Sequence, residues 1–161
     1  VNLNMSAAQL QNALALGIFD DRIRAHNVNA SRIVLEITES TLQSAKARQT
    51  IKRLKSLGIK VSIDDFGVGY SSLSYLRQFP ISHLKIDRSF LKHAPEDPYD
   101  GALLEAIINM GHKLELNIVA EGIETQEQSN YCKHLNVEYA QGFLFSKPLA
   151  PNEIEKLLTK K

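Results

Sequence analysis

Two adjacent carboxylates, Asp64 and Asp65, follow the short apolar segment 61–63 and precede glycines at positions 67 and 69. Neighbouring side chains of a regular strand point to opposite faces. Both acids can therefore converge on one point only where the strand stops and glycine lets the backbone turn. Converging carboxylates of this kind suit a divalent cation. A surface Asp-Asp turn is the alternative, because Asp is common in turns.

Other segments with strand-like sequences also carry a polar side chain near their C-terminal ends. These residues are Asn4, Glu36, Lys85, Glu121 and Gln141. A set of oxygen donors without nearby His or Cys favours Mg²⁺ or Mn²⁺ over zinc. Close carboxylates repel one another unless cations neutralise them. Two metal ions sharing Asp64 would do so and would hold the attacking and leaving oxygens of a phosphodiester.

Two further residues have more than one interpretation. Lys85 either orients the attacking water and stabilises the charged phosphorus, or forms an ion pair with one of the acids. Glu39 follows Glu36 by three residues; it is either an anchor for a loop or an acid favoured by a helix dipole. The loop 67–72, with two glycines and two serines, is either a mobile flap or an ordinary strand-to-helix connection.

Strand-like and helix-like segments alternate along the chain. The predicted strands are 1–5, 33–37, 59–64, 83–87, 117–121 and 139–145, and the predicted helices are 6–24, 40–57, 72–79, 99–114, 125–135 and 152–160. This alternation, at intervals of roughly 20 to 35 residues, is typical of parallel βα units. There is no linker or repeat, so we interpret residues 1–161 as a single domain.

The strands alternate apolar and polar residues, which indicates that their two faces differ. Leu35 and Ile37 flank Glu36, and Leu84 and Ile86 flank Lys85. Strands of a flat doubly wound sheet are buried on both faces and are apolar throughout. In a (β/α)₈ barrel the polar face would line the lumen, and the active site lies at the C-terminal rim. The sequence therefore favours a barrel over a doubly wound sheet, although both place ligands at strand carboxyl ends.

The composition excludes several classes of protein. With 161 residues, 43% hydrophobic and 23% charged, the chain is an ordinary globular domain. The net charge of +1 gives no basis for binding duplex nucleic acid. The single Cys132 excludes an internal disulfide. No apolar run is long enough to span a bilayer and no signal peptide is recognisable. We therefore expect a cytoplasmic segment without membrane contact. The abrupt start at Val1 suggests a fragment.

Five motifs occur in order: Glu36-Ile-Thr-Glu39-Ser40, Asp64-Asp65-Phe-Gly-Val-Gly-Tyr-Ser-Ser72-Leu, Leu84-Lys-Ile-Asp-Arg-Ser-Phe90, Val119-Ala-Glu-Gly-Ile-Glu124-Thr and Gln141-Gly-Phe-Leu-Phe. Together they closely resemble the EAL domain, a family of bacterial phosphodiesterases that hydrolyse cyclic di-GMP to linear pGpG. The resemblance covers essentially the whole chain. The segment 3–10 is similar to the family's Asn-bearing strand, so the resemblance points to Asn4 and not Asn2 as the metal ligand.

The resemblance implies a role for each candidate residue. Asn4, Glu36 and Asp64 would bind a first metal, and Asp64 and Asp65 a second. Lys85 and Glu121 would position and activate the water. Three residues would play supporting parts: Glu39 would fix the loop after Asp65, Gln141 would lie near the substrate, and Glu124 would support the rim.

One departure from the family pattern bears on these expectations. The Glu-Ala-Leu tripeptide, whose Glu is a metal ligand in the family, is absent, as are the Arg that follows it and the first two strands. A complete barrel takes about 250 residues, so we expect a barrel truncated to about six βα units. The two outer strands of such a half-barrel would have unpaired backbone groups, which lowers solubility. We expect a second copy, in a homodimer, or a rearrangement to close the gap.

The function expected from the resemblance is cyclic di-GMP hydrolysis by two metals in a longer parent protein. That parent would carry a regulatory or sensor domain on the N-terminal side, and any membrane anchor would lie in such added segments. The fragment itself is expected to be inactive. One alternative is a degenerate module that binds cyclic di-GMP or a protein partner without turnover. Others are a Mg²⁺-dependent barrel acting on an enolisable acid, with Lys85 as base, and a purely structural barrel.

Overall fold

The fold is a parallel half-barrel, seen in a computed structural model that describes residues 1–67, 76 and 78–159. Within these residues six parallel strands lie in the order in which they occur in the chain. They are β1 (Asn2–Asn4), β2 (Val34–Thr38), β3 (Lys60–Phe66), β4 (His83–Ile86), β5 (Asn117–Glu121) and β6 (Tyr139–Gln141). The predicted barrel truncated to six βα units is confirmed. In the described sheet, β1 and β6 remain outer strands with one neighbour each.

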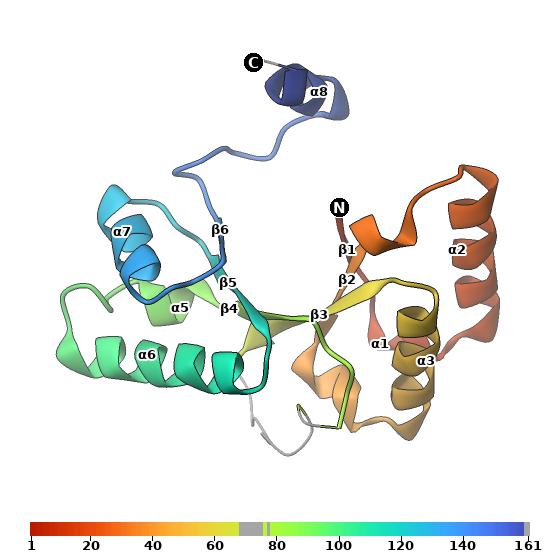
Figure 1. Cartoon of the computed structure of the whole chain (residues 1–161), viewed down its shortest axis with the longest axis horizontal. Coiled ribbons are helices and arrows are strands. Elements are labelled where there is room, and N and C mark those ends of the chain that lie inside the picture. Colours follow the sequence, from red (N-terminus) through yellow and green to blue (C-terminus); the bar gives the residue numbers. More distant parts are fainter. Residues whose placement is uncertain (68–75, 77, 160–161) are drawn as a thin grey trace.

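The helices between the strands lie outside the curved sheet, whereas the last helix follows the final strand and stands apart from the sheet (Figure 1). They are α1 (Ala7–Gln11), α2 (Ala13–Ala25), α3 (Ala45–Ser56), α5 (Arg88–Leu91), α6 (Pro98–Lys113), α7 (Gln126–His134) and α8 (Pro151–Thr159), with 3₁₀ turns η1 (Ala30–Arg32) and η2 (Glu39–Gln43). Most of the predicted helix 72–79 lies outside the described residues. Among the described residues, no helix combines the length and apolarity needed to cross a bilayer.

The predicted helix 6–24 is in fact two helices that meet at Asn12. The expected capping box at Ser6 is present, with the Gln9 backbone N–H donating to the Ser6 hydroxyl. Asn12 adopts an extended conformation, and its side chain accepts hydrogen bonds from the N–H groups of Leu14 and Ala15. An Asn side chain competes well for free N–H groups at a helix start. It therefore ends α1 and begins α2.

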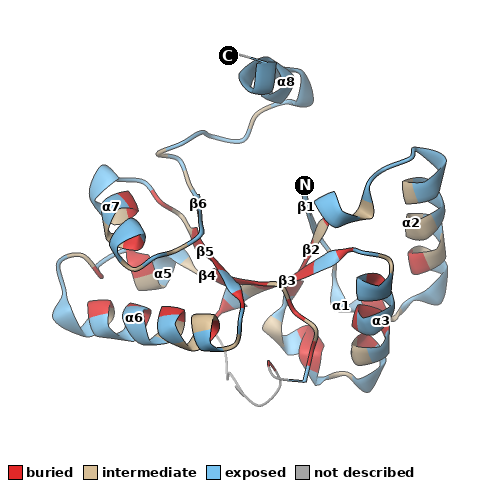
Figure 2. Cartoon of the chain, in the orientation of Figure 1, coloured by how far each residue is buried: buried red, intermediate tan, exposed pale blue. Residues whose placement is uncertain are grey.

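The two faces of the sheet have different surroundings, as the alternation in the sequence predicted. The outward side chains are apolar and buried against the helices; they include Leu35, Ile37, Val61, Ile63, Leu84, Ile86 and Ile118. The inward face carries the polar residues. Figure 2 shows this burial concentrated along β2 to β5 and the facing sides of α3 and α6. The core thus fixes the strands from one side and leaves the other for chemistry.

The last strand is shorter than the predicted segment 139–145. It ends at Gln141 because the chain turns back over Ile123, whose N–H donates to the Gln141 carbonyl and whose carbonyl accepts from Leu144 N–H. A Cβ atom at Gly142 would overlap the Ile123 backbone, so this close approach requires glycine. The segment that follows leads to α8, in which no residue is buried.

Candidate active site

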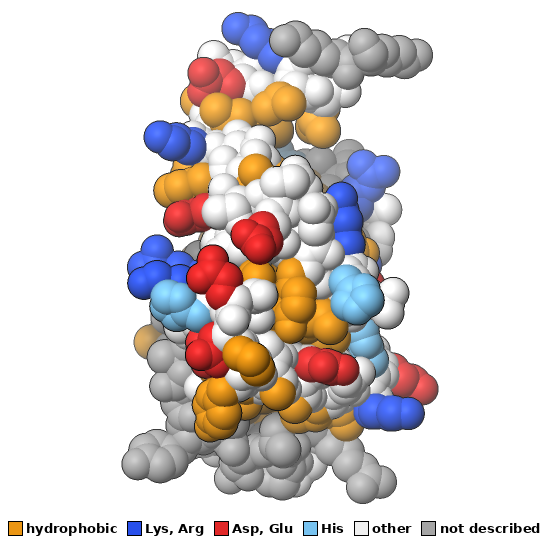
Figure 3. Space-filling model, turned by 90° about the vertical axis from the view of Figure 1, so that its left-hand side faces the viewer, with side chains coloured by type: hydrophobic (Ala, Val, Ile, Leu, Met, Phe, Trp, Pro, Cys, Tyr) orange, Lys and Arg blue, Asp and Glu red, His pale blue; other side chains and the backbone are white. Residues whose placement is uncertain are grey.

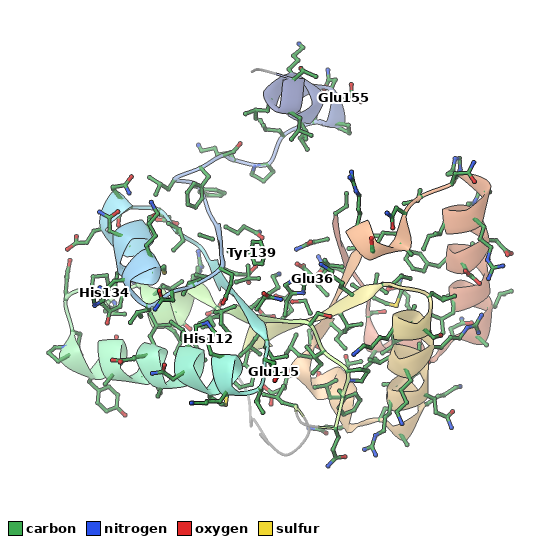
Figure 4. The ribbon with its side chains drawn as sticks, viewed as in Figure 1. Glu36, His112, Glu115, His134, Tyr139 and Glu155 are labelled. Carbon is green, nitrogen blue, oxygen red and sulfur yellow. The ribbon has the colours of Figure 1, made fainter. Side chains whose placement is uncertain are left out.

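The centre of the site is the buried ammonium group of Lys85 on β4. Its Nζ lies 2.9 Å from Glu36 Oε2, 2.8 Å from Asp64 Oδ1 and 2.8 Å from Glu121 Oε1. These acids come from β2, β3 and β5, and the Lys85 side chain is only 4% exposed. Figure 4 shows Glu36 on the inner side of the sheet. Lys85 thus forms the ion pair that one interpretation predicted, with three acids instead of one.

Lys85 and its three acids form a charge cluster in which the pKa values of Lys85 and Glu121 are shifted. Burial alone would lower the pKa of Lys85, but hydrogen bonds to Asp64, Glu121 and Glu36 outweigh it and raise the pKa above its usual value. These hydrogen bonds favour the charged form of Lys85. Burial raises the pKa of Glu121, and the charges of Asp64 and Glu36 act in the same direction against the opposing effect of Lys85. These effects favour the protonated form of Glu121 relative to a carboxyl group in water.

Asp64 and Asp65 converge because the backbone leaves the extended conformation at Asp65 itself. Asp65 has a φ of +52° and Gly67 a φ of +93°. The β3–β4 register shifts between Ile63 and Phe66. Carboxylate oxygens of Asp64, Asp65 and Glu121 then lie within 4.8 Å of one another. These three acids are close enough to share a cation. Partial burial and the charges of Asp64 and Asp87 raise the pKa of Asp65.

The first strand brings two asparagines to the inner face, both near Glu36. Asn4 pairs with Glu36 in the strand register, and the Met5 N–H donates to the Glu36 carbonyl. The side chain that contacts the Glu36 carboxylate is Asn2, whose Nδ2 donates to Oε1 over 2.7 Å. The role of Asn4 as a ligand stays a prediction. Asn2, which the resemblance set aside, is a site residue that the sequence interpretation missed.

Three further candidates lie outside the set of three acids that form ion pairs with Lys85. Gln141 lies beside Glu121 in the strand register and is exposed. Glu124 is exposed above a cavity of about 310 Å³ that Arg88 and Lys92 also line. Glu39 is the first residue of η2 and is half-buried. Its predicted role concerns a loop that falls largely on residues 68–75, outside the described part of the chain.

Asp87 is another group close to the site that was given no role from the sequence. It follows Lys85 by two residues, and its charge contributes to the raised pKa of Asp65. Its own pKa is lowered, because its side chain is hydrogen-bonded to Ser89 at the start of α5. The alternation Lys85, Ile86, Asp87 is the signal that would have identified it.

A comparison with known protein families gives the family that the sequence motifs resemble. A family model described as the EAL domain matches residues 1–148. The chain belongs to the EAL domain family. The EAL chain is 39% identical over 156 residues to the bifunctional diguanylate cyclase/cyclic di-GMP phosphodiesterase MucR of Pseudomonas aeruginosa. This match covers 96% of the chain but only 23% of MucR, so the chain spans about a quarter of that relative's length.

Solved structures of EAL proteins have the same fold. The EAL enzyme Bd1971, in a form with cAMP and cyclic di-GMP bound, superimposes with a TM-score of 0.94 at 37% identity, covering 98% of this chain and 42% of that one. Klebsiella pneumoniae BlrP1, in a manganese and cyclic di-GMP complex, gives a TM-score of 0.84 at 29% identity, covering 91% and 38%. The predicted family and fold of the EAL chain are both confirmed.

Proposed function

We propose that this EAL chain is the metal-binding part of a phosphodiesterase that hydrolyses cyclic di-GMP to linear pGpG. The main support is the convergence of Glu36, Asp64 and Glu121 on Lys85, with Asp65 beside them. Two relatives, MucR and NbdA of Pseudomonas aeruginosa, are cyclic di-GMP phosphodiesterases by name. The rival chemistry on an enolisable acid needs Lys85 as a base, which its raised pKa disfavours.

The donor set fits divalent cations. Glu36, Asp64 and Glu121 contact the Lys85 ammonium group and Asp65 lies beside Asp64 and Glu121, so the carboxyl groups outnumber the cation by three. Oxygen donors without His or Cys suit Mg²⁺ or Mn²⁺. The proposed ligands are Asn4, Glu36 and Asp64 for one ion and Asp64 with Asp65 for a second. When bound, the ions would supply Lewis-acid polarisation of the phosphodiester and stabilise charge on its oxygens.

The chain's own residues handle the proton and the water. A water molecule attacks phosphorus and the bond to the ribose 3′ oxygen breaks, which leaves a 5′ phosphate and a 3′ hydroxyl. We assign the water's proton to Glu121, whose carboxylate Lys85 holds in place and whose pKa burial raises, and from there to the departing ribose 3′ oxygen. Lys85 fixes the Glu121 carboxylate and offsets the negative charge that develops. Gln141 and Glu124 would contact substrate or support the rim, and Glu39 would hold the loop after Asp65.

Hydrolysis is proposed for a longer protein that contains this chain. In the family the Glu-Ala-Leu segment supplies one more metal ligand, and these residues are not in the 161 present here. We therefore propose that the chain alone hydrolyses cyclic di-GMP weakly or not at all. The parent would join it to a regulatory or sensor domain, act in the cytoplasm and form a homodimer.

The test is turnover of cyclic di-GMP by such a longer protein with Mg²⁺ or Mn²⁺, with pGpG measured by chromatography. Asp64→Asn should remove nearly all activity, whereas Asp21→Asn, on the exposed surface of α2, should leave it unchanged. An inactive wild type would refute the catalytic proposal. Metal-dependent binding of cyclic di-GMP by that inactive protein would establish the non-catalytic binding module instead.

A further inference from the structure

A cavity of about 310 Å³ lies beyond the carboxyl ends of β4 and β5, next to the charge cluster around Lys85. Its lining comes from α5, the segment after β5 and the first turn of α7: Arg88, Ser89, Lys92, Gly122, Glu124 and Gln128. Gly122 directly follows Glu121, which pairs with Lys85. Both β4 and β5 have two neighbours in the sheet, so the cavity does not involve the outer strands. A ligand held at the charge cluster can therefore extend into it.

Arg88, the first residue of α5, is held at this cavity by its contact with Gly122. A Cβ atom at Gly122 would overlap the Arg88 side chain, so the two segments approach as closely as glycine allows. The Arg88 side chain is exposed and lines the cavity. Its position is thus tied to the end of the strand that carries Glu121.

The cavity contains opposite charges that are not paired with each other. Arg88 and Lys92 share it with Glu124, yet none of the three takes part in an ion pair within the part of the chain that the structure describes. A guanidinium and a carboxylate in direct contact would satisfy each other. Held apart, they leave donors and an acceptor for a ligand that lies between them.

Gln128 adds a donor whose direction is fixed by the backbone. Its Oε1 accepts hydrogen bonds from the N–H groups of Glu124, at 2.9 Å, and Thr125, at 3.2 Å. The Nε2 amide is therefore the group that Gln128 can offer to a ligand. The cavity thus combines donors from Arg88 and Gln128 with acceptors from Glu124.

This combination does not suit a simple anion. Glu124 offers only acceptors and would repel a phosphate group. The surroundings give no compensating positive field, because the net charge of the chain is +1 and both acidic and basic side chains occur on the α6–α7 side of the molecule (Figure 3). The ligand should instead carry acceptors and donors on neighbouring edges.

A guanine base has these edges. Its O6 and N7 are acceptors that one Arg guanidinium can bind together. Its N1–H and 2-amino groups are donors that a carboxylate can accept. Adenine has an amino group in place of O6 and lacks the N1–H, so it would set a donor against Arg88 and leave Glu124 without a partner.

We propose that this cavity binds one guanine base of the cyclic dinucleotide, with Arg88 donating to O6 and N7 and Glu124 accepting from N1–H and the 2-amino group. The proposal rests on the proposed function, which places the phosphodiester at the charge cluster. From there the nucleotide passes Gly122 and its base enters the cavity, where Gln128 supplies a further donor. Arg88 and Glu124 are then specificity residues for guanine.

The first test measures kcat/KM for cyclic di-GMP, or Kd if the protein binds without turnover, in a longer protein that contains this chain. Arg88→Met and Glu124→Ala should each lower kcat/KM or affinity by about tenfold or more, chiefly through KM, because each removes a pair of contacts to the base. Glu127→Ala, at an exposed position of α7 that does not line the cavity, is the matched control and should match the wild type. Unchanged urea midpoints would show that the variants remain folded.

A ligand lacking one group distinguishes direct contact from a structural effect. Cyclic di-IMP lacks the 2-amino groups of cyclic di-GMP and should bind the wild type about tenfold more weakly. In Glu124→Ala this ratio should shrink, because the carboxylate that accepts from the amino group is gone. Any effect at the second base is the same in both proteins and cancels. A ratio equal to that of the wild type would overturn the proposal.

The results also separate the guanine site from the proposed hydrolysis. Hydrolysis by the wild type, with Arg88→Met and Glu124→Ala equally active, would refute the guanine site alone. Binding without turnover, weakened by both substitutions, would support the guanine site and refute the catalytic proposal. A wild type that neither binds nor hydrolyses cyclic di-GMP would refute both.

Discussion

The side-chain amide of Asn2 donates a hydrogen bond of 2.7 Å to Glu36 Oε1, while Glu36 Oε2 accepts from Lys85 at 2.9 Å. The two oxygens of one carboxylate are thus held by neighbours on two different strands. This fixes the orientation of Glu36 between β1 and β4. Asn2 is therefore engaged with Glu36, whereas Asn4 is the asparagine of β1 proposed as a metal ligand.

We predict that Asn4→Ala weakens Mn²⁺ binding more than Asn2→Ala. Asn4 is the proposed ligand, whereas Asn2 orients Glu36, and loss of its hydrogen bond should lower the free energy of unfolding by roughly 1 to 2 kcal/mol. Titration calorimetry with Mn²⁺ and urea unfolding measure the two effects. A larger loss of affinity in Asn2→Ala would show that Asn2 is the ligand.

Removing the central cation should destabilise the chain strongly. Lys85→Met leaves three carboxylates facing one another in a buried position, which should cost about 3 to 5 kcal/mol of unfolding free energy at pH 8. The loss should shrink as pH falls and the acids protonate. Lys55→Met, at an exposed position of α3, is the control. Equal urea midpoints for the two variants at pH 8 would contradict this account.

Gly67 is predicted to be required beside the aspartate pair. Gly67 has a φ of +93°, which other residues adopt only under strain. A Cβ atom added at Gly67 would also lie 2.6 Å from Phe90 Cζ. Gly67→Ala should therefore lower the free energy of unfolding by about 1 to 3 kcal/mol through strain and this clash. Adding Phe90→Ala removes the clash but not the strain. In a double-mutant cycle Gly67→Ala should then cost less; an unchanged cost would show that Phe90 is not the obstacle.

His83 should make the chain less stable in acid. Burial and the charge of Lys60 lower its pKa, against the opposing charge of Glu138, and its Nδ1 has no hydrogen-bond partner among the described residues. The folded state binds this proton less readily than the unfolded state. The contribution of neutral His83 to the free energy of unfolding is therefore fully present above pH 6.5 and is lost as pH falls below that value. His83→Gln should flatten this decline in urea midpoints between pH 7 and 5. His134→Gln, at an exposed site, should not.

The alternation of apolar and polar residues in the sequence predicted which strand side chains share a face of the sheet. Alternation of apolar and polar residues assigned Glu36, Asp64, Lys85 and Glu121 to one face, because side-chain direction in a strand follows directly from position. It could not separate Asn2 from Asn4, which share that face. The strand register places Asn4 opposite Glu36, yet the Asn2 side chain is the one that reaches its carboxylate, so only the side-chain conformations of the folded sheet separate the two.

Features that depend on distant contacts were not predictable in the same way. β6 ends early because the backbone of Ile123, far back in the chain, lies against Gly142. The convergence of the two aspartates requires a left-handed conformation at Asp65, which glycines further along only suggested. The end of β6 and the conformation of Asp65 depend on the packing of neighbouring segments. The strand and helix periodicities of the sequence do not predict such packing.

Lys85 acts as an internal counter-ion for the acids around it. Many metal centres fold only when their ion arrives, since the ligands otherwise repel one another. Here an ammonium group supplied by the chain already holds Glu36, Asp64 and Glu121 together. The half-barrel should therefore fold without the proposed metal ions, and a chelator should leave its unfolding free energy unchanged.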